Sequence, residues 1–239
     1  MKRLAGRRIL LTRSVEDCAE WAAQLAKHSA VPVALPCIET EIIDTPQLRA
    51  RLEAAVPQAD WLVFTSRRGV ESFATLHPGS IAAAQVAAVG PVTGEAARTR
   101  LGRIDLVGRG GTASLLAATM LVRGVLAGQP RLLLALAENA DDRLERALTK
   151  AARCTRFDLY RTIPIPATGG KRAMSSLGAD NVLLASPSAV TGYLNQVHID
   201  VPVSIYTIGP STSAAARAQG LAVTAEASVP TLAGILEAM

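Results

Sequence analysis

Aromatic residues are scarce in this chain. Phe, Trp and Tyr together make up 3% of its 239 residues, and no run of Lys or Arg exceeds two residues. Proteins that bind nucleic acids need stacking platforms and dense phosphate contacts, so this composition argues against a nucleic-acid partner. The formal net charge is nevertheless +5 and the isoelectric point is about 9.5. The composition therefore favours a small polyanion as the partner.

Cysteine and histidine are also few. Cys18, Cys37 and Cys154 lie far apart without a CxxC pair, and the three histidines are isolated. Disulfide frameworks and zinc sites need closely spaced ligands, so neither is expected here. We interpret the thiols as buried or incidental, and we expect no metal.

Long apolar runs and an export signal are missing as well. No uninterrupted apolar stretch reaches the roughly 18 to 20 residues that a membrane span requires. The opening MKRLAGRRILLTRS holds an apolar run of only about three residues before Thr12, which is too short for a signal peptide. We therefore expect a cytoplasmic protein that has no membrane partner.

Several familiar catalytic motifs are absent. No GxxxxGK[ST] phosphate loop occurs, and neither Ser66 nor Ser186 has the G-x-S-x-G context of a serine nucleophile. The stretch 108–113 formally fits G-x-G-x-x-A, but no acidic residue near position 130 is placed to bind a ribose. These observations argue against nucleotide hydrolysis, serine hydrolysis and a nicotinamide cofactor.

What the chain does contain is an internal repeat. The segments WLVFTSRRGVESF (61–73) and VAAVGPVTGEAARTRLG (86–102) return as NVLLASPSAVTGYL (181–194) and IYTIGPSTSAAARAQG (205–220), at offsets of 120 and 119. The segment 7–30 similarly resembles 130–153. A near-constant offset over several motifs indicates two similar halves.

Short apolar runs alternate with helical patterns of about ten to fifteen residues, which is typical of parallel α/β sheets. Proline and β-branched residues at 36–43 and 160–166 instead predict extended connectors. The pattern predicts two five-stranded sheets, with strands at 8–12, 31–35, 61–64, 86–89, 104–107, 132–136, 155–159, 182–185, 205–208 and 221–224.

The turns after these strands are rich in Ser, Thr and Gly. Helix N-termini at such turns present unpaired N–H groups and a positive dipole end, which attract carboxylates or phosphates. Ordinary helix capping is the alternative for any one turn. Seven such turns together favour a shared anion site, at 12–14, 65–69, 90–94, 108–114, 186–189, 209–213 and 228–231.

Tyr160 is the one connector side chain that can both donate a proton and bury an apolar ring. Spacing alone leaves two interpretations open: a packed residue with a satisfied hydroxyl, or a proton donor.

Taken together, VFTSRRGVESF, VGPVTGEAA, LASPSAVTGYL, IGPSTSAAARAQG and PTLAGILEAM resemble the uroporphyrinogen-III synthase family. ILLTR and DLYRT also match, so the resemblance covers essentially the whole chain. It implies two flavodoxin-like α/β domains of parallel sheets joined by two extended connectors. Residues 1–36 and 166–239 would form a discontinuous domain, 42–158 the inserted domain, and 37–41 and 159–165 the connectors.

The resemblance also implies the chemistry. The family closes hydroxymethylbilane, a linear tetrapyrrole with eight carboxylates, into uroporphyrinogen III in heme and porphyrin biosynthesis, with inversion of the last pyrrole ring. It is a lyase of the hydro-lyase type that uses no cofactor. The implied route loses the terminal hydroxyl as water and then passes through a spiro-pyrrolenine. The enzyme must therefore assist a poor leaving group and hold a flexible chain.

Site residues carry over by position. Tyr160 matches the family's tyrosine that is favoured as proton donor to the leaving hydroxyl. The chain departs from the family where Leu136, Ala137 and Glu138 replace a common Arg-Gly-Glu, while Arg68 supplies a cation where Asn is common. The expected substrate-binding residues are Arg13, Thr65, Ser66, Gly90, Ser186, Ser188, Pro210, Ser211 and Thr212.

These observations predict a monomeric cytoplasmic synthase. A two-domain protein that binds a small polyanion without chemistry would use the same turns and connectors. A nucleotide-dependent oxidoreductase, binding near Gly108, is the third alternative.

Overall fold

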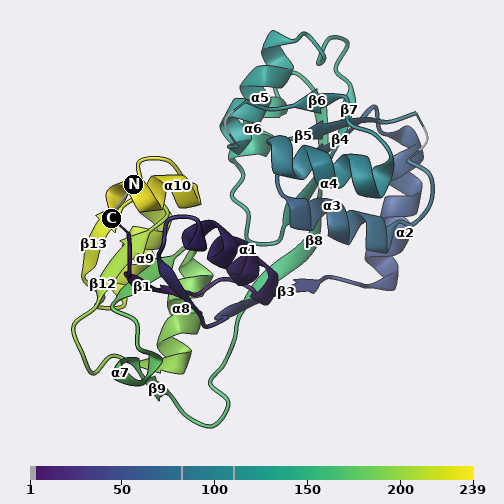
Figure 1. The fold of residues 1–239 in the computed structure, drawn as a ribbon. Helices are drawn as coiled ribbons and strands as arrows, with labels where there is room; N and C mark the ends of the chain where they lie inside the picture. The colour runs from purple at the N-terminus through teal and green to yellow at the C-terminus, as the bar shows by residue number, and fades with distance from the viewer. Residues whose placement is uncertain (1–3, 82, 110) are drawn as a thin grey trace. The chain divides into compact units, whose positions relative to one another are not determined.

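The computed structural model describes residues 4–81, 83–109 and 111–239. The chain divides into two compact units, shown in Figure 1. Unit 1 comprises Met1–Glu39 and Thr162–Met239, and unit 2 comprises Thr40–Arg161. The chain thus passes from one unit to the other near residues 39 and 161, within the stretches predicted as connectors.

Unit 1 is built on a five-stranded parallel sheet. The strand order is β13-β12-β10-β1-β2. The strands are β1 (Arg8–Leu11), β2 (Val31–Ala34), β10 (Asn181–Leu184), β12 (Ser204–Thr207) and β13 (Val223–Glu226). The helices of this unit are α1 (Val15–Ala26), α7 (Met174–Leu177), α8 (Pro187–Gln196), α9 (Pro210–Ala218) and α10 (Leu232–Ala238).

Unit 2 is built on a six-stranded sheet in the order β3-β8-β7-β4-β5-β6. Its strands are β3 (Ile38–Ile42), β4 (Trp61–Phe64), β5 (Gln85–Ala88), β6 (Leu106–Val107), β7 (Arg131–Ala137) and β8 (Arg153–Pro164). Its helices are α2 (Pro46–Ala55), the 3-10 helix η1 (Val56–Gln58), α3 (Arg67–Leu76), α4 (Pro91–Leu101), α5 (Ala113–Val122) and α6 (Arg143–Leu148).

The two sheets share one topology. Read from β6, the sheet of unit 2 runs β6-β5-β4-β7-β8, and each strand matches the repeat-related strand in β13-β12-β10-β1-β2 of unit 1. Each unit combines strands from both sequence repeats: unit 1 takes β1 and β2 from the first and the other three from the second, while unit 2 does the reverse. The sequence repeat therefore corresponds to a repeated sheet topology, but the boundaries of the repeats are not the boundaries of the two units.

The expectation of two five-stranded sheets is wrong in two respects. The stretch 37–41 lies largely in β3, and most of 159–165 belongs to β8, so the sheet of unit 2 gains a sixth strand. Ile43 N–H donates to the Leu159 carbonyl and Ile165 N–H donates to the Cys37 carbonyl, at 2.9 and 2.8 Å. Residue numbers rise on one strand as they fall on the other, so β3 and β8 are antiparallel.

A third sheet, of two strands, was also not predicted. It pairs β9 (Arg172–Ala173) with β11 (Val197–His198). Strands of two residues are too short to leave an alternating pattern in the sequence, which explains why they were missed.

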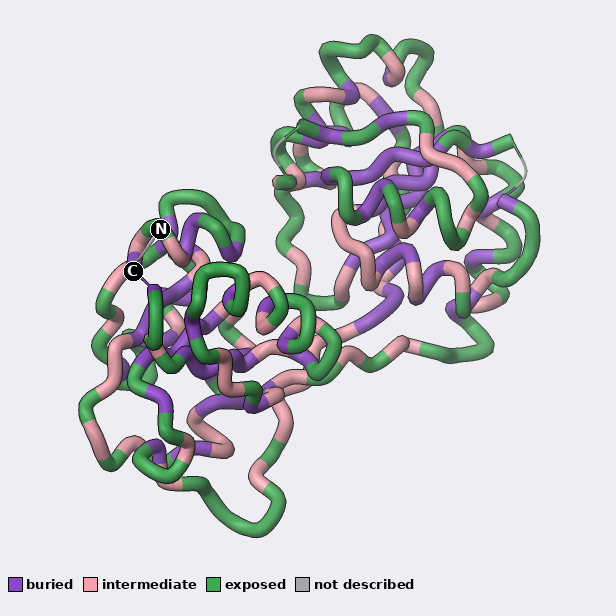
Figure 2. The backbone as a smooth tube through the Cα atoms, in the orientation of Figure 1, coloured by how far each residue is buried: buried purple, intermediate pink, exposed green. Residues whose placement is uncertain are grey.

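Each sheet buries alternate side chains on opposite faces. In β1, Ile9 and Leu11 pack with α1 and α10, whereas Leu10 packs with α8 and α9. In β4, Leu62 and Phe64 pack with α2 and α3, and the intervening Val63 packs with α5 and α6. Figure 2 shows buried backbone concentrated along these strands. Helices on both faces explain why the strands read as continuous apolar runs.

Local sequence features explain several helix ends. Thr45 caps α2 by accepting a hydrogen bond from Leu48 N–H at 3.1 Å. Gly102 and Gly220 follow their helices with φ of 77° and 78°, the left-handed conformation expected of a C-terminal glycine. Gly209 is the N-cap of α9, and Ser211 lies in the first turn of this helix.

No helix among the described residues is both long and apolar enough to span a membrane.

Candidate active site

The predicted polar turns gather at one edge of each sheet. In unit 2 they follow β4, β5 and β6 and lead into α3, α4 and α5; in unit 1 they follow β1, β10, β12 and β13. All the strands named here run parallel within their sheet, so their carboxyl ends share an edge. In open α/β sheets this is the edge where ligands bind. Gly110, within the turn at 108–114, lies outside the described residues.

Ser66 is the N-cap of α3. Its backbone is extended, with φ of −157° and ψ of 156°, and its Oγ accepts a hydrogen bond from Gly69 N–H at 2.9 Å. The same Oγ lies 2.7 Å from the hydroxyl oxygen of Tyr160. One predicted binding residue and the predicted proton donor are therefore hydrogen-bonded to each other.

Tyr160 is 8% exposed and packs with the apolar cluster that includes Phe157 and Leu159. Burial raises the pKa of its phenol above the ordinary 10, while the Ser66 hydrogen bond and the charge of Arg68 act in the opposite direction. The phenol is therefore protonated at neutral pH. The two neighbours stabilise the phenolate that proton donation would leave.

A β-bulge sets the direction of the Tyr160 side chain. Along the pairing of β7 with β8, Leu136 lies opposite Asp158 and Ala137 lies opposite Tyr160, so Leu159 is an extra residue. Consecutive residues of a regular strand face opposite sides, yet Leu159 and Tyr160 belong to the same apolar cluster. The bulge thus turns Tyr160 toward the face on which α3 packs.

Thr65 and Gly90 occupy neighbouring turns of unit 2. Thr65 is half-buried between β4 and the Ser66 cap. Gly90 is buried and caps α4 without a side chain, and its carbonyl accepts from Gly94 N–H at 2.9 Å. Pro91 follows as the first residue of the helix, where its missing N–H costs nothing.

Ser186 and Ser188 lie together in unit 1. Ser186 caps α8, and its Oγ accepts from Ala189 N–H at 3.1 Å. The hydroxyl oxygens of Ser186 and Ser188 are 3.0 Å apart. This turn repeats the Ser66 cap with a serine, rather than a tyrosine, as the hydroxyl partner.

The three predicted residues at the start of α9 differ in exposure. Pro210 and Ser211 are exposed, whereas Thr212 is 1% exposed and its N–H donates to the Gly209 carbonyl at 3.1 Å. The Thr212 side chain therefore packs within unit 1, and Pro210 and Ser211 form the accessible surface of this turn.

Arg13 follows β1 and is held by two neighbours on α1. Its guanidinium forms an ion pair with Asp17 at 2.8 Å and lies 4.4 Å from the centre of the Trp21 ring. The side chain is 25% exposed. Arg13 thus keeps a defined position at the carboxyl edge with part of its charge accessible.

Comparison with known proteins decides the family. Residues 19–237 match the family model described as uroporphyrinogen-III synthase HemD, which is most of the chain. The chain belongs to the uroporphyrinogen-III synthase family. Members of this family cyclise hydroxymethylbilane to uroporphyrinogen III, and the cofactor-independent lyase description fits the family.

Solved uroporphyrinogen-III synthases share the fold. A mutant enzyme from the extremely thermophilic bacterium Thermus thermophilus is 18% identical with a TM-score of 0.58, over 97% of this chain and 96% of the other. The enzyme from Helicobacter pylori 26695 is 15% identical with a TM-score of 0.65, over 97% of each chain. No curated protein sequence matches significantly. The predicted family, α/β fold class and reaction are thereby confirmed.

Arg156 is the most informative residue that sequence reasoning missed. Its Nη2 donates to the carbonyls of Ala137, Glu138 and Ala140 at 3.1 to 3.2 Å, and its Nε donates to Asp158 at 2.7 Å. It holds in place the loop where the common Arg-Gly-Glu is replaced. The alternation of Arg156 and Asp158 along β8 was the only available signal.

A buried polar chain in unit 1 also escaped the sequence. Thr207 and Ser213 are fully buried with hydroxyl oxygens 2.7 Å apart, and Ser213 also donates to a carboxylate oxygen of Glu226. The three residues tie together β12, α9 and β13 at the carboxyl edge. Their spacing in sequence carries no motif, because only the parallel pairing of β12 and β13 brings them together.

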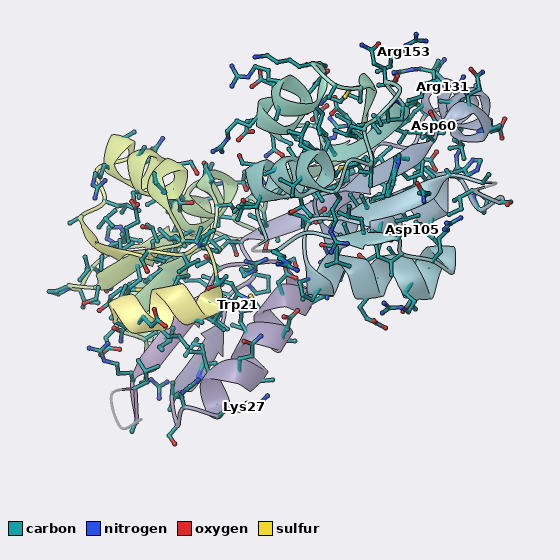
Figure 3. All side chains as sticks on the ribbon, turned by 90° about the horizontal axis from the view of Figure 1, so that it is seen from above. Trp21, Lys27, Asp60, Asp105, Arg131 and Arg153 are labelled. Carbon is teal, nitrogen blue, oxygen red and sulfur yellow. The ribbon has the colours of Figure 1, made fainter. Side chains whose placement is uncertain are left out.

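A cavity in unit 2 lies away from the candidate site. It has a volume of about 490 Å³ and is lined by Arg51, Arg131 and Arg153 over a floor that includes Leu133 and Phe157. Figure 3 labels Arg131 and Arg153 at one end of unit 2, where β7 and β8 begin. It is thus at the amino ends of the strands, opposite the edge that bears Ser66.

Within the described ranges, no three His, Cys, Asp or Glu side chains are grouped as a metal ion would need.

Proposed function

We propose that this chain forms uroporphyrinogen III by using Tyr160 as the proton donor to the departing hydroxyl of hydroxymethylbilane. The observation that carries this role is the position of Tyr160. It is a protonated phenol on β8, and its hydroxyl oxygen lies 2.7 Å from Ser66 Oγ. Ser66 is the N-cap of α3 at the carboxyl edge of the sheet in unit 2. A positioned proton donor accelerates departure of a poor leaving group by about 10²- to 10⁴-fold.

The overall reaction is balanced without an external oxidant or reductant. The bond from the terminal methylene carbon to its hydroxyl breaks, the hydroxyl leaves as water with the donated proton, and the cation that remains is stabilised by its pyrrole. A carbon–carbon bond to the substituted position of the last ring then forms, and fragmentation and reclosure invert that ring. The proton lost on aromatisation restores the Tyr160 phenol. We accordingly propose that no cofactor takes part.

Substrate carboxylates would be bound by the turns at the carboxyl edges. Backbone N–H groups at the N-termini of α3, α4, α8 and α9 attract anions without charged side chains. Arg13 and Arg68 add positive charge beside these turns. The net charge of +5 favours association with a substrate that carries eight carboxylates.

The decisive experiment is an isomer analysis. Purified protein is supplied with hydroxymethylbilane, and the product is oxidised and separated into type I and type III uroporphyrins. We expect type III, whereas spontaneous closure in a heat-denatured control gives type I. Only type I product from folded protein would reject the reaction for this chain and leave a polyanion-binding protein as the interpretation.

We also propose that the enzyme acts as a monomer in the cytoplasm. The three cysteines are free thiols, the usual state in a reducing compartment. Sedimentation equilibrium at micromolar concentration should give a mass near the 25.0 kDa of one chain. A mass of twice that value would reject the monomer, and recovery of the protein in an exported fraction would reject the location.

A further inference from the structure

We propose that Ser66 is a positioning residue that turns the Tyr160 proton toward the substrate. The inference rests on the proposed role of Tyr160, and it assigns Ser66 a task beyond substrate binding. Two observations support it: the Ser66 oxygen is fixed, and a β-bulge directs the Tyr160 side chain toward it. A chemical argument then gives the direction of the hydrogen bond between the two hydroxyls.

The Ser66 oxygen cannot move freely. It accepts from Gly69 N–H at 2.9 Å, so it is tied to the first turn of α3. The helix packs on the core through Val70 and Phe73, which are fully buried. The oxygen is therefore a rigid reference point, in contrast to a serine on a free loop.

The tyrosine reaches this point across an intervening strand. Ser66 follows β4 and Tyr160 lies on β8, with β7 between them in the sheet. Strands two places apart are separated by about 9 to 10 Å, a distance that the tyrosine side chain, the serine side chain and the 2.7 Å hydrogen bond between them span together. Ala137, a small residue on β7, packs in the same cluster, and the bulge at Leu159 turns Tyr160 to this face.

The direction of the hydrogen bond matters for catalysis. A phenol that donated to Ser66 would direct its proton away from a substrate. If Ser66 donates its own proton to the phenol oxygen, the Tyr160 proton is free to point elsewhere. Ser66 retains its single donor for this purpose, because its contact with Gly69 N–H uses only a lone pair. When Tyr160 becomes a phenolate, donation from Ser66 is the only arrangement possible.

Unit 1 supplies the natural comparison. Ser186 makes the same cap with Ala189 N–H, but its hydroxyl partner is Ser188, at 3.0 Å. A Ser186→Ala variant therefore loses an equivalent helix cap without touching the tyrosine. It separates the effect of a lost cap from the effect of a lost tyrosine partner.

The test measures Tyr160 ionisation directly. The chain has three tyrosines, so replacing all of them with the more acidic 3-fluorotyrosine gives three ¹⁹F resonances, assigned by Tyr→Phe variants. We expect Ser66→Ala to raise the Tyr160 pKa by about one to two, because a charged hydrogen bond to the phenolate is lost. Ser186→Ala should leave it unchanged. An unchanged or lowered Tyr160 pKa in Ser66→Ala would overturn the inference.

A second variant covers the case in which Ser66→Ala does not fold. Asp caps helices about as well as Ser but cannot donate a hydrogen bond when ionised, so Ser66→Asp keeps α3 and removes the donor. We expect a larger rise of the Tyr160 pKa than with Ala, because a negative charge also opposes the phenolate. No rise in Ser66→Asp would reject the donor role.

Turnover then links this bond to the reaction. For Ser66→Ala we expect kcat to fall on the order of 10- to 100-fold, as for a misplaced catalytic group, with Ser66→Thr restoring most of it. A rise in KM with kcat unchanged would assign Ser66 to substrate binding alone and overturn the positioning role. The fluorine titration needs no substrate, so absence of type III product from the parent enzyme would reject the proposed function separately.

Discussion

The two units use one scaffold for different hydroxyl partners. At an offset of 120, Ser66 of unit 2 corresponds to Ser186 of unit 1, and both cap a helix that follows the central part of a parallel sheet. Arg68 corresponds to Ser188 at the same offset. When the alignment of residues 7–30 with 130–153 is extended along the chain, Tyr160 corresponds to Cys37. Unit 2 thus gathers a phenol and a cation around its serine, whereas unit 1 has a second serine and a buried thiol.

This difference separates what the fold needs from what the reaction needs. The serine cap recurs because each helix has unpaired N–H groups at its start. The tyrosine does not recur, and its position depends on a bulge in β8. Residues common to both units therefore report on architecture, and residues found in one unit are the better candidates for chemistry.

The largest effect should come from removing the residue that only unit 2 has. Tyr160→Phe is expected to slow formation of uroporphyrinogen III by about 10²- to 10⁴-fold with an unchanged fold, because the ring remains and only the proton donor is lost. Initial rates with hydroxymethylbilane measure this. Tyr193→Phe in unit 1 is the matched control, since its hydroxyl contacts only the Met174 sulfur among the hydrogen bonds described. Equal rates in both variants would remove Tyr160 from catalysis.

We next expect different losses of stability when two residues that correspond in the repeats, Gly192 of unit 1 and Ser72 of unit 2, are each replaced by alanine. A Cβ added at Gly192 would lie 1.9 Å from the Cys37 carbonyl oxygen, so backbone must move in unit 1. We expect Gly192→Ala to lower the free energy of unfolding of unit 1 by about 3 kcal/mol or more. Urea denaturation can follow Trp21 of unit 1 and Trp61 of unit 2 separately, using variants with one Trp replaced by Phe.

Ser72→Ala is the control for that experiment. Ser72 is buried on α3 of unit 2 and already accommodates a side chain, so its loss should cost only about 1 kcal/mol. If Gly192→Ala is no more destabilising than Ser72→Ala, the close approach of α8 to Cys37 does not constrain position 192.

Alkaline pH should destabilise unit 1 more than unit 2. Burial raises the pKa of the Cys37 thiol from 9.0 to about 12 and that of Cys18 to about 11, both in unit 1, whereas unit 2 has one such thiol, Cys154, whose pKa is raised to about 11. Between pH 9 and 12 the unfolded thiol ionises while the folded Cys37 stays protonated, so rising pH favours unfolding. Below pH 9 both states are protonated and this loss disappears.

The expected loss from Cys37 alone is on the order of 2 to 3 kcal/mol by pH 11. Urea titrations at pH 8 and pH 11, followed through Trp21, measure it. Cys37→Ala should show a smaller pH dependence than the parent. An equal pH dependence in the two proteins would show that Cys37 does not cause the alkaline loss.

The smallest effect concerns the two serine caps. Ser186→Ala should destabilise its unit by about 1 kcal/mol, the usual cost of a lost N-cap. Ser66→Ala should cost about 1 kcal/mol more, because the buried Tyr160 hydroxyl also loses its partner. Thermal unfolding of the two variants gives the comparison, and equal losses would indicate that the tyrosine finds another partner.

Much of the fold could be predicted because it depends on local patterns. Apolar runs such as 61–64 and 182–185 coincide with strands, and caps such as Thr45 are explicit in the sequence. The sheet of unit 2 was harder. Residues 38–42 become a strand only because β8 is long enough to pair with them, and this pairing depends on contacts between residues more than 100 positions apart.

The turns that form the candidate site could be predicted from the sequence, but the contacts between their side chains could not. The strand–turn–helix pattern identified Ser66 and Ser186, and the family resemblance identified Tyr160. The contact between Ser66 and Tyr160 depends on the bulge at Leu159, which has no sequence signature because Leu suits either a regular or a bulged strand. Thr212 was assigned to binding by position, and its burial emerges only when α9 packs on its sheet.

Because each unit combines strands from both sequence repeats, the strands of one sheet are synthesised at different times. All strands of unit 2 have left the ribosome soon after residue 164, whereas β1 must wait for β10, about 170 residues after it. At about 5 to 20 residues per second, Ile9, Leu10 and Leu11 lack their β10 neighbour for roughly 10 to 35 seconds. β1 is therefore enclosed much later than it is made, and the nascent chain has most need of a chaperone at this strand.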